Sequence, residues 1–206
     1  MDTDYGPVVV RRKGNLVALN RHGFERPLPP HAINYRANVA ALQMLGVTDV
    51  ITLSSVGSLD PDLPPGSLVS CVDYMSFAPK TFIDDRMSAF APVVGNLLLD
   101  EIAAASSTQV LRGKIYAQTP GPRFETRAEV RALRGWGADV VGMTFANEAD
   151  LMLERGISVT SFCMVDNFAH GVSPEPLSME AFEALVAANQ RIVDGFLETL
   201  VGLYLS

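Results

Sequence analysis

The feature that most constrains this chain is a repeated alternation of short apolar segments with amphipathic ones. The spacing of apolar residues predicts strands at 49–53, 67–72, 110–118, 139–143 and 157–165, and helices at 34–45, 91–106, 126–134, 148–155 and 178–203. Strands that alternate with helices of this length are typical of a sheet that helices cover. We therefore expect an α/β fold with a mixed, mostly parallel sheet flanked by helices, preceded by a hairpin around Lys13 and Gly14.

Length and composition indicate how many such units the chain holds. It has 206 residues, of which 48% are apolar and 19% charged. A domain commonly has about 100 to 200 residues. This composition excludes a disordered or low-complexity protein. We expect a single domain over residues 1–206.

The net charge and the two cysteines indicate which ligands and which kind of site to expect. The formal net charge is −7, so the chain has no overall electrostatic reason to bind nucleic acid. Cys71 and Cys163 fall in predicted strands without metal-ligand spacing, which favours buried, reduced thiols over a disulfide and predicts no metal site. We expect no signal peptide and no membrane-spanning helix, hence a cytoplasmic protein that does not bind membranes.

Polar residues gather where the predicted strands end, which is where open parallel sheets bind ligands. They are the runs 21–23, 54–58, 143–144 and 166–167, together with the loop 121–126. Hydroxyl side chains, glycine and arginine together are typical of a phosphate pocket. Taken alone, these runs also have ordinary structural explanations. The run 21–23 fits a strand end and 54–58 fits a tight turn. Glu125 fits a helix cap, and Asp166 and Asn167 fit an Asx turn. The prediction of a site depends on their occurrence together.

The same runs carry a family resemblance. They are RHG (21–23), PPH (29–31), NYRAN (34–38), GSL (57–59), PG (65–66), GPRFETRAE (121–129) and GADVVGMT (137–144). In this order and spacing, from about residue 5 to the C-terminal helix, the chain resembles the trimeric purine nucleoside phosphorylase and methylthioadenosine phosphorylase family. The resemblance implies a nucleoside phosphorylase-like domain.

The resemblance also implies a reaction and roles for particular residues. Phosphate attacks C1′ of a nucleoside and a free purine leaves, so the enzyme is a pentosyltransferase that uses phosphate as co-substrate and needs no metal or organic cofactor. Its phosphate site would consist of Arg21, His22, Ser54, Ser55 and Thr144, and its nucleoside site of Phe124, Glu125, Met143, Asp166 and Asn167. Among these, Asn167, Glu125 and Arg21 would be the catalytic residues.

Glu125 and Asn167 indicate the base. A carboxylate at Glu125 accepts the N1–H of hypoxanthine or guanine, whereas adenine presents a lone pair there. Asn167 donates to O6 and accepts the N7–H, and asparagine at this position is the family's 6-oxopurine pattern. We therefore expect inosine and guanosine as substrates. The alternatives are a methylthioadenosine or methylthioinosine phosphorylase, a phosphate-independent nucleoside hydrolase, or a non-catalytic nucleoside-binding protein.

Several features depart from the family pattern. The glycine-rich phosphate loop that family members carry upstream of the RHG run does not occur in residues 1–20, so we expect an N-terminally shortened domain with weakened phosphorolysis. Arg26 stands where a second histidine is common, and Asp166 stands where threonine is common. His170 is expected on the surface. The family implies a homotrimer, and Met87 to Val94 is a candidate contact segment, although core packing explains its apolar character equally well.

Overall fold

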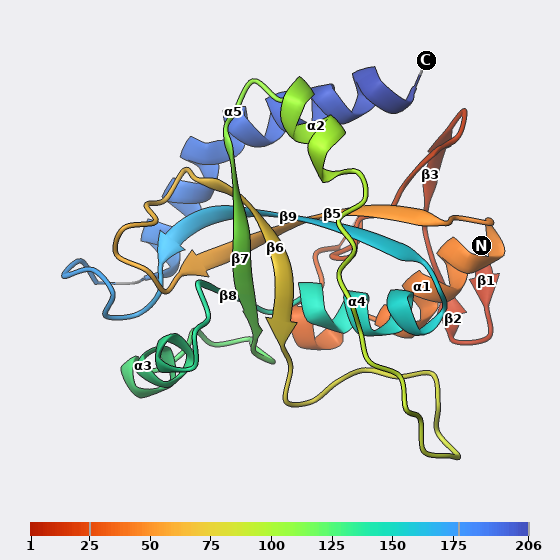
Figure 1. Ribbon diagram of the computed structural model, residues 1–206, viewed down its shortest axis with the longest axis horizontal. Coiled ribbons are helices and arrows are strands. Elements are labelled where there is room, and N and C mark those ends of the chain that lie inside the picture. Colours follow the sequence, from red (N-terminus) through yellow and green to blue (C-terminus); the bar gives the residue numbers. More distant parts are fainter. Residues whose placement is uncertain (25, 177, 206) are drawn as a thin grey trace.

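The centre of the fold is a mixed sheet of five strands that closes on itself. A computed structural model describes residues 1–24, 26–176 and 178–205. The strands run in the order β5 (Asp49–Ser58), β8 (Val140–Gly142), β7 (Val110–Gln118), β6 (Leu68–Met75) and β9 (Ser158–Phe168), and β9 pairs again with β5 (Figure 1). The β5–β9, β6–β7 and β7–β8 pairs are parallel, and the other two are antiparallel. The expected mixed, mostly parallel sheet is confirmed, but its closure into a barrel was not expected.

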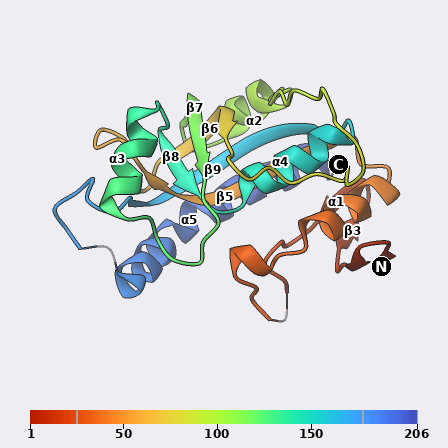
Figure 2. The ribbon, with the colours of Figure 1, turned by 90° about the horizontal axis from the view of Figure 1, so that it is seen from below.

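Helices cover the barrel on two sides. α1 (Tyr35–Met44) and α4 (Phe145–Glu154) lie together on one side, which faces the viewer in Figure 2, while α2 (Leu99–Ala105) and α5 (Met179–Tyr204) lie on the other. α3 (Arg127–Gly135) follows β7. Successive side chains of β9 pack on opposite faces of the sheet, because strand side chains alternate in direction. Phe162 packs on Phe196 of α5 with ring centroids 4.7 Å apart, whereas Cys163 belongs to the cluster that contains Phe145 of α4.

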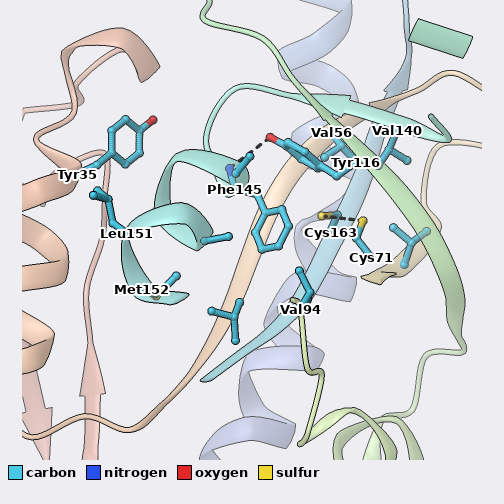
Figure 3. Packing of buried hydrophobic residues seen from close by; sticks show 14 of the residues in the cluster. Tyr35, Val56, Cys71, Val94, Tyr116, Val140, Phe145, Leu151, Met152 and Cys163 are labelled. Carbon is cyan, nitrogen blue, oxygen red and sulfur yellow. Dashed lines mark hydrogen bonds between the residues drawn. The ribbon is translucent and has the colours of Figure 1, made fainter. Parts of the chain in front are cut away.

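The two cysteines are buried and reduced, as the sequence predicts. Cys71 and Cys163 are free and fully buried, with their Sγ atoms 3.9 Å apart (Figure 3). The hydrogen bond with Cys163 and burial together raise the pKa of the Cys71 thiol well above its ordinary value. The Cys71 thiol is therefore held protonated in an apolar interior.

The N-terminal residues form two short hairpins before a 3₁₀ helix. β1 (Asp2–Thr3) pairs with β2 (Gly6–Pro7), and β3 (Arg11–Lys13) pairs with β4 (Leu16–Ala18), which confirms the predicted hairpin. Gly14 turns between β3 and β4 at a φ of 57°, where glycine is favoured. The 3₁₀ helix η1 (Pro30–Ala32) then leads into α1. No helix in the described ranges is long and apolar enough to cross a bilayer.

The predicted boundaries differ from the structure at several places near the sheet edge. β5 continues through residues 54–58, predicted as a turn, because these residues pair with β9 over their whole length. β9 likewise extends past Val165 to Phe168, and α4 begins at Phe145 rather than 148. The helix predicted over 91–106 occupies only Leu99–Ala105. The residues before it are irregular, and Asn96 has a φ of 48°, which a helix does not accept.

Candidate active site

A cavity of about 370 Å³ lies where the ends of several strands meet segments distant in sequence. β5 contributes residues 55–57, the end of β8 and the residues after it contribute 141–144, the end of β9 contributes Asn167 and Ala169 follows it, and the start of α5 contributes Met179 and Phe182. Of the residues expected in the phosphate and nucleoside sites, the structure brings the following to this cavity: Arg21, His22, Ser55, Phe124, Glu125, Met143, Thr144 and Asn167. Ser54 and Asp166 do not line it. A larger cavity of about 750 Å³ adjoins it, and Pro30 and Glu125 line both.

Arg21 reaches the cavity from a loop and is held there by two partners. Its Nε donates to Glu148 Oε1 at 2.7 Å, and its Nη1 donates to the Leu53 carbonyl at 3.0 Å. Burial acts to lower the pKa of Arg21, but the charge of Glu148 and the hydrogen bond with it raise that pKa above its ordinary value. Arginine carries five N–H donors, so donors remain on the guanidinium for an anion in the cavity.

His22, beside Arg21, is also oriented by the backbone. Its Nδ1 lies 2.8 Å from the Leu28 carbonyl oxygen. A carbonyl only accepts, so Nδ1 carries the proton in this contact, and Nε2 is left for other partners.

The two serines of β5 point in opposite directions, because strand side chains alternate. Ser55 is exposed and lines the cavity. Ser54 is buried on the other face of the strand, and its hydroxyl has no hydrogen-bond partner among the described residues. Of the two serines, the structure brings Ser55 to the cavity and leaves Ser54 on the other face of β5.

Thr144 caps α4 without using its hydroxyl. The first N–H groups of a helix normally need a capping side chain. Here the Tyr116 hydroxyl accepts from Thr144 N at 3.1 Å, and Gln118 Oε1 accepts from Ala146 N at 3.1 Å. The Tyr116 hydroxyl also accepts from Phe145 N at 3.3 Å, as Figure 3 shows. The Thr144 side chain makes no capping bond, so its hydroxyl remains available to a ligand.

Glu125 is the buried carboxylate of the site. It is 6% exposed, and its Oε1 accepts a 2.6 Å hydrogen bond from the Thr119 hydroxyl. The Glu125 carbonyl lies 3.2 Å from His170 Nδ1. His170 Nε2 in turn lies 3.3 Å from Arg127 Nε, which can only donate. His170, expected on the surface, therefore holds the backbone of the loop that carries Glu125.

Asn167 offers one donor and one acceptor to the cavity. Its Nδ2 donates to the Phe168 carbonyl at 2.7 Å, which leaves a second amide hydrogen and Oδ1. Gly57 lies beneath it, since a Cβ there would stand 3.3 Å from Asn167 Nδ2. The small residue lets the amide lie flat against β5.

Asp166 differs from the expectation because the strand is irregular at this point. The β5–β9 register shifts between Val56, paired with Val165, and Gly57, paired with Asn167, so that Asp166 is an extra, unpaired residue. Its carboxylate accepts from Asn189 Nδ2 of α5 at 2.9 Å and is buried. Asp166 joins β9 to α5 instead of contacting the cavity.

The remaining walls of the cavity are apolar. Phe124 packs edge-on against Phe182 of α5, with ring centroids 5.6 Å apart, and Met179 lies on the same helix. Met143 lies over Gly121, where a Cβ would meet the Met143 sulfur at 2.6 Å. A planar ring and an apolar sugar face suit such walls.

The sequence alone does not identify the residues that support this site: Tyr116, Gln118, Thr119, Glu148 and Asn189. All but Thr119 act on a residue more than 20 positions away, and Thr119 acts on Glu125 across a loop, so local patterns carry no sign of these partners. A signal did exist for Glu148, because it follows Thr144 by four positions and so shares its helix face. The predicted start of α4 at 148 concealed that spacing.

Comparisons with known proteins agree with this geometry. The model of the Phosphorylase superfamily matches residues 5–201. A probable 6-oxopurine nucleoside phosphorylase of Moorella thermoacetica is 34% identical over 98% of this chain and 84% of its own. A probable S-methyl-5′-thioinosine phosphorylase of Methanocaldococcus jannaschii is 37% identical over 87% of this chain and 75% of its own.

Solved structures show the same fold. A methylthioadenosine phosphorylase from Schistosoma mansoni, in complex with adenine, superposes with a TM-score of 0.81 at 26% identity and covers 98% of this chain and 83% of its own. One from an antarctic soil metagenomic library gives a TM-score of 0.79 at 27% identity, over 100% of this chain and 79% of its own. The chain therefore belongs to the Phosphorylase superfamily, as a pentosyltransferase with the nucleoside phosphorylase fold.

Proposed function

We propose that this enzyme is a purine nucleoside phosphorylase that acts on 6-oxopurine nucleosides such as inosine and guanosine. The observation that carries the proposal is one cavity that gathers a half-buried arginine, two hydroxyls, a carboxylate and a primary amide, in Arg21, Ser55, Thr144, Glu125 and Asn167. Relatives named as 6-oxopurine nucleoside phosphorylases support it. Inorganic phosphate is the co-substrate, and the reaction needs no metal or organic cofactor.

In the proposed reaction a phosphate oxygen attacks C1′ of the nucleoside while the C1′–N9 bond breaks. The bonding electron pair leaves with the base, and the products are the free purine and ribose 1-phosphate. No protein nucleophile is required, so catalysis depends on holding phosphate in line and on stabilising developing charge. Arg21, Ser55 and Thr144 supply donors for phosphate, and Met143 supplies an apolar surface for the sugar.

The base is recognised by its hydrogen-bonding edge. The free oxygen of Glu125 accepts the N1–H of a 6-oxopurine, and the second amide hydrogen of Asn167 is donated to O6. Asn167 Oδ1 accepts the N7–H of the departing base, which gains, in net terms, the proton that hydrogen phosphate loses when its oxygen bonds to C1′. A site that pairs buried polar groups in this way rejects a base that leaves them unpaired, by up to about 10⁴-fold.

The decisive experiment incubates the protein with inosine, with and without phosphate, and assays hypoxanthine, ribose and ribose 1-phosphate. We expect ribose 1-phosphate to appear only with phosphate. Equal release of free ribose in both reactions would instead identify a hydrolase, and no release at all would favour a nucleoside-binding protein.

A second substrate is favoured by the wall that α5 contributes. Met179 and Phe182 are both apolar and suit a thioether better than a hydroxyl. Several relatives are named S-methyl-5′-thioinosine phosphorylases. If this wall faces the 5′ position of the sugar, 5′-methylthioinosine is the better substrate. The ratio of its kcat/KM to that of inosine, at saturating phosphate, decides between the two.

We also propose that the enzyme assembles as a homotrimer through the segment between β6 and α2. Contacts to α4 anchor this segment, with Lys80 N donating to Asp150 and Phe82 N donating to Glu154. Beyond the anchors, Met87 is 95% exposed and Val93 is 74% exposed. Exposed apolar side chains on an anchored segment support a subunit contact over core packing. Sedimentation velocity measures the mass directly, and a monomer would contradict the proposal.

A further inference from the structure

Within the described ranges, one side chain donates a hydrogen bond to the Glu125 carboxylate. The Thr119 hydroxyl donates to Glu125 Oε1 at 2.6 Å, which is short, as hydrogen bonds to ionised groups are. Thr119 directly follows β7, and it lines the larger cavity but not the smaller one. It therefore approaches Glu125 from behind, as seen from the cavity that holds the other site residues.

Thr119 is itself fixed by the sheet. Its backbone N–H donates to the Gly142 carbonyl at 2.9 Å, which continues the β7–β8 pairing beyond the end of β7. Threonine is branched at Cβ, so its χ1 angle has few allowed values. The Thr119 hydroxyl lies 3.4 Å from the Gly142 carbonyl oxygen and 2.6 Å from Glu125 Oε1, so its one hydrogen is donated to the nearer acceptor. This bond orients the carboxylate.

The hydrogen bond from Thr119 matters because Glu125 lies between two cavities. Glu125 lines both the 370 Å³ cavity and the 750 Å³ cavity beside it, and its χ3 torsion has no strong preference of its own. With Oε1 engaged by Thr119, Oε2 is the oxygen left for a ligand. Without that bond the carboxylate is free to rotate toward the larger cavity.

We propose that Thr119 is a positioning residue that sets the base specificity of this enzyme by fixing the Glu125 carboxylate. This inference rests on the proposed function, in which Glu125 accepts the N1–H of a 6-oxopurine. A single acceptor in a fixed direction rewards a base with a donor at N1 and penalises adenine, which places a lone pair there. A carboxylate that rotates freely avoids that penalty and loses the discrimination.

The test compares Thr119→Val, which keeps the shape and removes the donor, with Thr119→Ser, which keeps the donor. At saturating phosphate we expect Thr119→Val to lower kcat/KM for inosine about ten- to hundredfold, the worth of one hydrogen bond to a charged group. The loss should fall mainly on the KM for inosine, and the inosine-to-adenosine ratio should fall with it. The KM for phosphate should not change, and Thr119→Ser should recover most of the loss.

Thr108→Val is the matched control. Thr108 lies before the start of β7, at the opposite end of that strand from Thr119, and it is half-buried. The same substitution there should leave both kinetic constants unchanged. An unchanged inosine-to-adenosine ratio in Thr119→Val would overturn the proposal, as would equal rises in the KM for phosphate and for inosine.

The role of Thr119 can be tested even if the proposed function is wrong. If the wild-type protein does not phosphorolyse inosine, calorimetric binding of hypoxanthine to the wild type and to Thr119→Val replaces the kinetic test. Weaker binding by the variant then supports the role of Thr119, and equal affinity rejects it.

Discussion

At the scale of single residues, the phosphate end of the site depends on an ion pair. Glu148 is buried and accepts from Arg21 Nε, while its second oxygen has no hydrogen-bond partner within the described part of the chain. Thr144 and Glu148 are four residues apart on α4, so one helix face presents both a ligand hydroxyl and the anchor of Arg21. The pair neutralises part of the cationic charge and in exchange fixes the direction of the guanidinium.

Removing that anchor should therefore weaken phosphate binding specifically. We expect Glu148→Ala to raise the KM for phosphate about tenfold or more, because a hydrogen bond to a charged group contributes about 1.5–3 kcal/mol. The KM for inosine should change little. Glu148→Gln keeps an acceptor for Arg21 Nε and should lie between the wild type and Glu148→Ala. Initial rates at varied phosphate measure the effect, and a KM for phosphate equal to that of the wild type would show that Glu148 does not position Arg21.

At the scale of elements, the sequence predicts the strands and helices well but their ends poorly. Apolar runs mark the buried middle of each strand, as at 49–53 and 157–165. The ends are polar because they form the site, and there the pairing between β5 and β9 decides the conformation. Residues 54–58 and 166–168 therefore belong to strands although their side chains are typical of turns. The bulge at Asp166 has no local signal, and it decides which side chain faces the cavity.

α3 is an element whose predicted start is confirmed, and its cap is sensitive to pH. Thr126 accepts from Glu129 N, and Thr126 N donates back to the Glu129 carboxylate. The hydrogen bonds from Arg123 and then from Thr126 lower the pKa of Glu129 from its ordinary 4.5 to about 2. This cap directly follows Glu125 and so fixes the end of the site loop.

The stabilisation by Glu129 should therefore disappear in acid. A carboxylate with a lowered pKa in the folded state contributes stability above its unfolded pKa and loses it as pH falls through the folded value. We expect Glu129→Gln to be less stable than the wild type near pH 7, with the difference shrinking from about pH 4.5 towards pH 2, and also in high salt, because the group is exposed. Urea unfolding across pH 3–7 measures the difference. Glu183→Gln, at an exposed position on α5, should show no such trend.

At the scale of the whole molecule, the site exists only because the barrel closes. Its cavity brings together segments that are far apart in sequence, with lining residues at 21–22, 55–57, 122, 124–125, 141–144, 167, 169, 179 and 182. The resemblance to a family locates most of these residues, but composition and periodicity do not show that they meet. The β5–β8 and β6–β9 pairs that close the barrel are each only two residues long, too short to be marked by any sequence pattern.

A ligand that bridges these segments should stabilise the entire fold, because it binds the closed barrel and not the unfolded chain. At 100 times the dissociation constant, binding contributes about 2.7 kcal/mol. For a chain of this size each kcal/mol raises Tm by about 2–4 °C, so hypoxanthine with phosphate should raise it by about 5–11 °C. Asn167→Ala should lose most of the shift caused by hypoxanthine and keep the shift caused by phosphate. Scanning calorimetry with each ligand alone and with both measures these values. If neither ligand moves Tm at millimolar concentration, the cavity does not bind a purine and phosphate together, and the proposed reaction would have no site in this chain.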